Sequence, residues 1–124
     1  MVIFDSSIIV EAIRKNKAAR ALIESQAENG RIAITIITKY EILRGTDKED
    51  LSLISKWLNQ FIIYEFDDLA LAEAVKAYKK LKEGGKLINE FDVLIAGIAS
   101  ANNETLITKD KDFSNFEDPK ITIL

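Results

Sequence analysis

Four acidic residues interrupt apolar stretches of this 124-residue chain: Asp5, Glu41, Asp92 and Asp110. A carboxylate beside a hydrophobic core is costly to ionise, and an unpaired one usually takes up a proton instead. All four are explained together if they converge on one divalent cation. Mg²⁺ and Mn²⁺ prefer oxygen ligands and need only a few carboxylates. Such an ion can activate water and stabilise the charge of an in-line phosphoryl displacement, so we predict metal-assisted phosphodiester hydrolysis.

Each acid taken alone has a structural alternative. Asp5 could cap the helix that follows it, and Asp110 could be an ordinary turn residue. Glu41 could be a surface glutamate paired with Arg44 three residues later. Asp92 lies near a predicted helix start, where an acid complements the helix dipole. The functional interpretation therefore depends on the four acids occurring together.

The composition excludes several classes of chemistry. The chain has no cysteine and no histidine, which excludes disulfides, thiolate catalysis, serine–histidine triads and most zinc or non-haem iron sites. Catalysis must then depend on carboxylates, lysines, hydroxyls or a metal bound by oxygen. The net charge of −3 argues against a broad electrostatic nucleic-acid binder, although local patches decide phosphate contact more than the total does.

Basic residues flank two of the acids. Lys39 and Arg44 surround Glu41, and Lys109 and Lys111 surround Asp110. Cations around a carboxylate pocket could hold the phosphates of a nucleic acid over the metal. The alternative is that they are solvated residues that complement helix ends. We predict nucleic-acid contacts for all four.

The elements that must position these residues alternate along the chain. Apolar runs predict strands at about 1–5, 32–35, 61–66, 105–108 and 121–124, and helical periodicity predicts helices at about 6–14, 16–28, 36–44, 47–59, 68–83 and 87–102. We expect Ser6 and Ser7 to cap the first helix. This order predicts an α/β fold with a mostly parallel sheet, helices on both faces and one domain over 1–124. Ligands of such sheets bind beyond the carboxyl ends of the strands, where Asp5 and Asp110 would meet if their strands are neighbours.

No apolar run approaches the roughly 18 residues that can span a membrane, and the first residues lack the pattern of a signal peptide. We therefore expect a soluble cytoplasmic protein with no membrane contact.

At these residues the chain resembles the PIN-domain ribonucleases, and in particular the VapC-type toxins of toxin–antitoxin systems. The resemblance covers essentially the whole chain and rests on four segments: VIFDSSI (2–8), TKYEILRG (38–45), FDVLIAGIA (91–99) and LITKDKDF (106–113). Their order and spacing make the match specific. Two positions depart from the family pattern: Ser6 replaces the commoner threonine, and Gly97 stands where alanine is usual. Neither is a proposed ligand.

The resemblance implies a homodimeric three-layer α/β/α domain that cleaves RNA with Mg²⁺ or Mn²⁺. It also implies a small antitoxin partner, a segment of which covers the acidic pocket, often with a basic side chain. The acidic quartet of the family, which binds metal and catalyses, corresponds to Asp5, Glu41, Asp92 and Asp110. Ser7 matches the family's small hydroxyl residue, and Thr108 is expected to support the ligands with it. Asp112 either adds to the site or caps a turn.

Rival functions fit less well. A phosphatase with its nucleophile at Asp5 would need a second acid two residues later, where Ser7 stands, and a response-regulator receiver would need an acid paired with Asp5. A rival of a different class is a non-catalytic module of the same fold that dimerises and binds RNA or a partner. The intact set of acids favours the enzyme.

Overall fold

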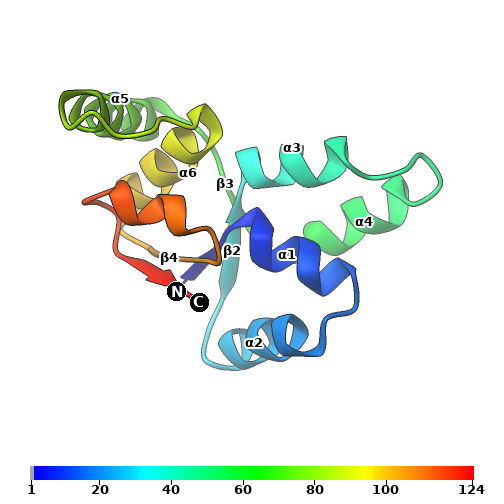
Figure 1. The fold of residues 1–124 in the computed structure, drawn as a ribbon. Helices are drawn as coiled ribbons and strands as arrows, with labels where there is room; N and C mark the ends of the chain where they lie inside the picture. Colours follow the sequence, from blue (N-terminus) through cyan, green and yellow to red (C-terminus); the bar gives the residue numbers. More distant parts are fainter. Residues whose placement is uncertain (1) are drawn as a thin grey trace.

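The computed structural model describes residues 2–124 and, within them, a five-stranded parallel sheet (Figure 1). The strands are β1 (Val2–Phe4), β2 (Ile32–Thr35), β3 (Ile62–Tyr64), β4 (Thr105–Thr108) and β5 (Ile121–Ile123). Their order across the sheet is β3-β2-β1-β4-β5, so the first strand of the chain is the central one. Every pairing is parallel, which requires a crossover between neighbours, and helices supply most of the crossovers. The predicted sheet type is confirmed.

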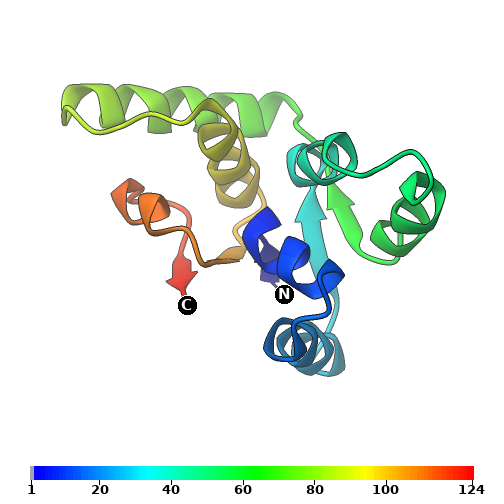
Figure 2. The same cartoon turned by 45° about the vertical axis from the view of Figure 1, so that its right-hand side comes forward.

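Helices cover both faces of this sheet (Figures 1 and 2). They are α1 (Ser6–Ile13), α2 (Lys17–Glu28), α3 (Ile36–Arg44), α4 (Leu51–Leu58), α5 (Asp68–Glu83), α6 (Glu90–Ala101) and a short 3₁₀ helix, η1 (Lys111–Asn115). α1, α2 and α4 gather on one side, and α6 and η1 lie on the other with α5 outside them. No helix within residues 2–124 is both long and apolar enough to cross a bilayer.

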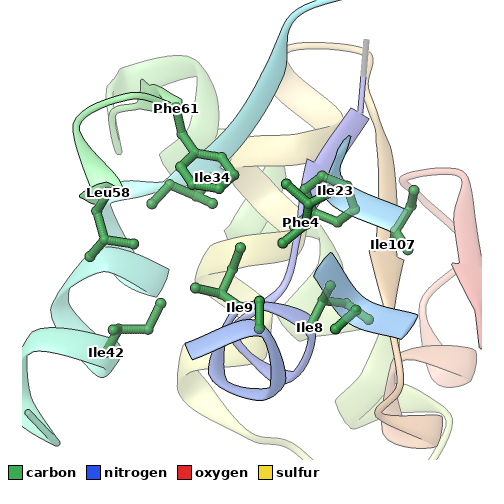
Figure 3. Close-up of a cluster of buried hydrophobic side chains, with 11 residues drawn as sticks. Phe4, Ile8, Ile9, Ile23, Ile34, Ile42, Leu58, Phe61 and Ile107 are labelled. Carbon is green, nitrogen blue, oxygen red and sulfur yellow. The ribbon is translucent and has the colours of Figure 1, made fainter. Parts of the chain in front are cut away.

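The side chains of β1 alternate between two cores. Phe4 is fully buried in the larger cluster, which α1, α2, α3 and α4 share, and Figure 3 shows it near Ile8 of α1 and Ile34 of β2. Ile3 is fully buried in the second cluster, with Ile95 of α6 and others. A strand buried on both faces needs apolar residues at every position, which is why β1 reads as a continuous apolar run.

α5 and α6 approach each other closely at Gly97. A Cβ atom on this residue would lie 2.7 Å from the Cβ of Ala74 and 2.8 Å from the carbonyl oxygen of Ala70. Real Cβ atoms do not tolerate such distances, because interiors are packed without spare volume. The departure from the family pattern at Gly97 is therefore matched by the packing of α5 against α6.

Two local expectations were wrong. The predicted helix at 47–59 begins at Leu51, because residues 48–50 form turns. Asp5, rather than Ser6 or Ser7, occupies the N-cap position of α1, and its side chain makes no capping hydrogen bond. The serine hydroxyls instead donate to the Asp5 carboxylate. Asp5 thus starts the helix by its backbone conformation and keeps its carboxylate for other contacts.

Candidate active site

Two of the predicted acids, Asp5 and Asp110, lie at the carboxyl edge of the sheet. Asp5 follows β1 directly, and its N–H donates to the carbonyl oxygen of Ile107 in β4 at 2.9 Å. β4 ends at Thr108, so Asp110 follows it by two residues. The pairing of β1 with β4, on which the expected meeting of Asp5 and Asp110 depended, is confirmed. Both acids therefore leave the same edge, from adjacent strands.

The carboxylate of Asp5 is buried and is oriented by hydroxyl groups. Its Oδ2 accepts hydrogen bonds from Thr108 Oγ1 at 2.8 Å and from Ser7 Oγ at 3.1 Å, and Ser6 Oγ lies 3.5 Å from Oδ1. Lys109 N–H in turn donates to Ser7 Oγ at 3.0 Å. The two strong hydroxyl contacts thus occupy one oxygen, and Oδ1 is the oxygen left for another ligand.

The turn after β4 is held by the same network. Asp110 N–H donates to Thr108 Oγ1 at 3.0 Å, and the Oδ1 of Asp110 accepts from Asp112 N–H at 2.9 Å. Asp110 is thus the N-cap of η1, and the exposed Asp112 lies in its first turn. Asp112 is close enough to act electrostatically on Asp92.

Glu41 is positioned by α3, which starts without a loop from β2. The N-cap is the buried Thr35, whose Oγ1 accepts from Thr38 N–H at 3.0 Å. Burial, and then the charge of Asp5, raises the pKa of Glu41, while Arg44 acts in the opposite direction. Its Oε1 atom is buried and, among the residues that the structure describes, has no hydrogen-bond partner. A buried acceptor of this kind usually has a function or an unseen partner.

Asp92 is the most perturbed of the acids. It lies in the first turn of α6, where the N-cap Asn89 accepts from its N–H at 3.2 Å. Burial is the main reason why its pKa is raised from 3.8 to about 7. The remaining causes are the negative charges of Asp5, Asp110, Glu41 and Asp112. The five acids therefore share one electrostatic environment, although they come from four separate parts of the chain.

The donor set suits a hard divalent cation. Within residues 2–124, no three acidic side chains lie close enough together to hold one ion directly. Mg²⁺ is commonly bound through one or two carboxylates and several waters, so three direct contacts are not required. The unpartnered Glu41 Oε1 and the raised pKa of Asp92 are both features that a cation would relieve. The residues present fit such an ion, and the meeting of all four acids at it stays a prediction.

The predicted RNA-binding residues differ in their surroundings. Lys109 forms an ion pair with Glu11 of α1, and Lys39 Nζ donates to Asn59 Oδ1 at 2.9 Å. Lys111 is exposed at the start of η1. Arg44 is exposed and lies over aromatic rings.

Sequence reasoning missed three contributors to this region. Glu11, which pairs with Lys109, is 98 positions away along the chain, so no local pattern predicts the contact. The rings of Tyr40 and Phe91 meet across α3 and α6. Thr35 could have been found, because a threonine between a strand and a helix is a common N-cap.

Comparisons with known proteins agree with this geometry. A model of the PIN domain family matches residues 2–119. Ribonuclease VapC3 of Methanocaldococcus jannaschii is 33% identical over 96 residues, which cover 77% of this chain and 95% of that protein. Ribonuclease VapC1 of the same organism is 29% identical over 111 residues, or 89% of this chain and 76% of its own length.

A solved structure shows the same fold. The crystal structure of VapBC2 from Rickettsia felis, bound to a DNA fragment from their promoter, superposes with a TM-score of 0.90 and 26% identity. The match covers 100% of this chain and 99% of that one. The family model, the relatives and the shared fold lead to one conclusion. This chain belongs to the PIN domain family, and its relatives there are VapC ribonucleases.

Proposed function

We propose that this chain is a metal-dependent endoribonuclease and the toxin of a VapBC-type toxin–antitoxin pair. The observation that carries the proposal is a buried acid beside four others in a chain of the PIN domain family: burial, and then the charges of Asp5, Asp110, Glu41 and Asp112, raise the pKa of Asp92 to about 7. Ribonucleases of this family are metal-dependent in general. Mg²⁺ or Mn²⁺ is the expected ion, because the donors are carboxylate oxygens.

The proposed roles follow from the surroundings of each acid. Asp5, Asp92, Asp110 and Glu41 hold the ion, directly or through water. The bound ion supplies an activated water and neutralises charge on the phosphoryl oxygens. Ser7 and Thr108 fix one oxygen of Asp5, which leaves Oδ1 for the ion. Glu41 Oε1 is a buried acceptor that can take a proton from the attacking water.

The RNA strand would be held by the basic residues around these acids. Arg44 and Lys111 are exposed and can contact phosphates directly. Lys109 can exchange Glu11 for a phosphate at small cost, because ion pairs of partly exposed side chains are worth only about 0–1 kcal/mol. Phosphate contacts of this kind position the strand without reading its sequence.

Besides the acidic site, a second proposed antitoxin contact is a groove of about 770 Å³ between α1, α2 and α4, in which an apolar floor is flanked by charged residues. Its apolar lining consists of Ala12, Ile13, Ile23, Leu53, Ile54 and Trp57. Leu53 is 68% exposed at this groove, and a bound partner would cover its side chain. A groove of this shape can take the apolar face of an amphipathic helix. Trp57, the only tryptophan of the chain, would report binding by its fluorescence.

Cleavage of a mixed pool of single-stranded RNA tests the nuclease assignment. The parent chain should cleave with Mg²⁺ or Mn²⁺ and stop with a chelator, and Asp5→Asn should abolish cleavage while remaining folded. Asp68→Asn is the matched control, because Asp68 is an exposed acid on α5. Equal cleavage by the parent and by Asp5→Asn would refute the site assignment. RNA binding without cleavage under any metal condition would favour the non-catalytic module.

A further inference from the structure

Two aromatic rings and a guanidinium group meet where α3 and α6 pack together. The ring centroids of Tyr40 and Phe91 are 5.9 Å apart, and their planes cross at 86°. The Cζ atom of Arg44 lies 5.4 Å from the centre of the Tyr40 ring and 5.3 Å from that of Phe91. Both distances are within the range of a cation–π contact. We refer to these three residues as the ring cluster.

The ring cluster lies beside two of the proposed metal ligands. Tyr40 directly precedes Glu41, and Phe91 directly precedes Asp92, so each ring leaves the same helical turn as one of the proposed metal ligands. Arg44 also acts on the pocket, because its charge lowers the pKa of Glu41. A nucleotide next to the one being cleaved would therefore pass the ring cluster.

The ring cluster is fixed in position but uncovered. Tyr40 is 54% exposed, and the edge-to-face contact with the half-buried Phe91 limits how its ring can rotate. Arg44 forms no salt bridge with any acid in the part of the chain that the structure describes. The exposed ring of Tyr40 and the guanidinium group beside it therefore present flat surfaces on which a ligand can stack.

On the basis of the proposed function, we propose that the ring cluster stacks one unpaired base of the RNA substrate beside the cleavage site. Unpaired RNA bases stack on aromatic rings and on arginine planes, and the contact tolerates sequence because every base has a π-face. A base inside a duplex is already stacked on its neighbours. The ring cluster therefore favours an unpaired base over a paired one at this position of the substrate.

Abasic scanning tests this proposal directly. Single-stranded RNA oligonucleotides that each lack one base, at a position moved along the strand, are titrated with Mg²⁺ into protein carrying Asp5→Asn, which prevents cleavage. We expect one position at which loss of the base weakens binding by at least about fivefold. Adding Tyr40→Ala should weaken binding of the intact strand to the same extent and remove the sensitivity to that position.

Two further variants of Tyr40 separate the effect of its aromatic ring from that of its size, and a variant at another residue is the control. Tyr40→Phe keeps the ring and should bind like tyrosine. Tyr40→Leu keeps a large apolar side chain without a π-face and should bind RNA as weakly as Tyr40→Ala. Because leucine preserves packing better than alanine, this variant remains informative if Tyr40→Ala disturbs folding. Leu69→Ala truncates an exposed side chain on α5, outside every proposed site, and should bind RNA normally.

The alternative results are distinguishable. Equal sensitivity at every abasic position, or unchanged affinity of the Tyr40→Ala and Tyr40→Leu variants, overturns the stacking site. If Tyr40→Ala instead separates a dimer into monomers and leaves the base dependence intact, the ring cluster is an interface between copies and the proposal is wrong. Metal-dependent cleavage by the parent chain alongside either result would leave the proposed function standing. Absence of both cleavage and binding by the parent would remove both proposals.

Discussion

Asp92 should make the metal-free protein less stable as the pH rises, and Asp92→Asn should remove this dependence. Its side chain is 9% exposed, and burial followed by the charge of neighbouring acids raises its pKa from 3.8 to about 7. The unfolded chain loses this proton near pH 4, whereas the folded chain keeps it to about pH 7. The unfolded state therefore binds fewer protons between these values, and the free energy of unfolding falls as the pH rises through them.

The magnitude follows from the same two values. The difference between 3.8 and about 7, at 1.36 kcal/mol per pKa unit, is worth about 4 kcal/mol. The amide introduced by Asp92→Asn would be neutral at every pH, and the lost interaction of the carboxylate with the N-terminus of α6 costs about 0.3–1 kcal/mol. We therefore expect Asp92→Asn to raise the free energy of unfolding by about 2–4 kcal/mol at pH 8 and to have little effect at pH 4.

Urea unfolding in the presence of a chelator, at several pH values between 4 and 8, measures this effect. The chain contains no histidine, and its other carboxyl groups, including Glu41 with its raised pKa, are present in both proteins, so the difference between parent and variant reports Asp92. Adding Mg²⁺ or Mn²⁺ at pH 8 should then stabilise the parent, because a ligand that binds only the folded state raises its stability. The Asp92→Asn variant should gain clearly less from the ion.

Asp68→Asn is the matched control, because Asp68 also lies in the first turn of a helix but is exposed. Its effect should stay within about 1 kcal/mol and should not grow with pH. A stability difference between Asp92→Asn and the parent that is the same at pH 4 and pH 8 would refute the argument from burial and repulsion. Equal stabilisation of both proteins by the metal would show that Asp92 is not a ligand.

Other features of the structure give sharper local tests. Gly97→Ala should destabilise the protein by about 1–3 kcal/mol in urea unfolding, because the added Cβ would collide with α5. The control Gly84→Ala should be tolerated, because a Cβ there meets nothing closer than 3.4 Å. Thr108→Val removes the hydroxyl that bonds both the Asp5 carboxylate and the Asp110 N–H. It should lower the free energy of unfolding by about 1–3 kcal/mol and weaken metal binding measured by calorimetry, and Thr108→Ser should restore both. Lys109→Ala should weaken RNA binding most at low salt and leave metal affinity unchanged. Glu11→Gln should strengthen RNA binding by freeing Lys109, and equal affinities at all salt concentrations would contradict both expectations.

The sequence predicts those parts of the fold in which local and tertiary requirements agree. β1 is apolar at each described position because both of its faces are buried, and the helices on either side carry clear apolar stripes. The start of α4 at Leu51 was missed because the acids at 47–50 are as suitable for a turn as for a first helical turn. The order of the strands in the sheet could not be predicted, because hydrophobic periodicity does not say which strands are neighbours.

The candidate site was predictable as a set of residue types but not as an arrangement. Asp5 and Asp110 follow strands, so their shared edge follows from the topology of parallel sheets. The approach of α3 to α6, which brings Tyr40 to Phe91, depends on helix packing that no local pattern encodes. The fit of Gly97 against α5 is of the same kind, because the glycine makes sense only once the facing helix is known.

The position of Asp5 at the end of the central strand helps to explain how the fold tolerates the acidic site. Burial and like charges both disfavour the ionised form of a carboxyl group, and together, with burial first, they raise the pKa of Asp92 to about 7. Asp5 lies at the end of the strand that joins both cores, and hydroxyls from its own helix and from β4 fix its carboxylate. The two hydrophobic cores on either side of β1 thus stabilise the fold, whereas the acids at the site repel one another. Neutral substitution of Asp92 or of Glu41, the two acids whose pKa is raised, should accordingly gain stability and lose cleavage together, which is the pattern expected of a site selected for chemistry.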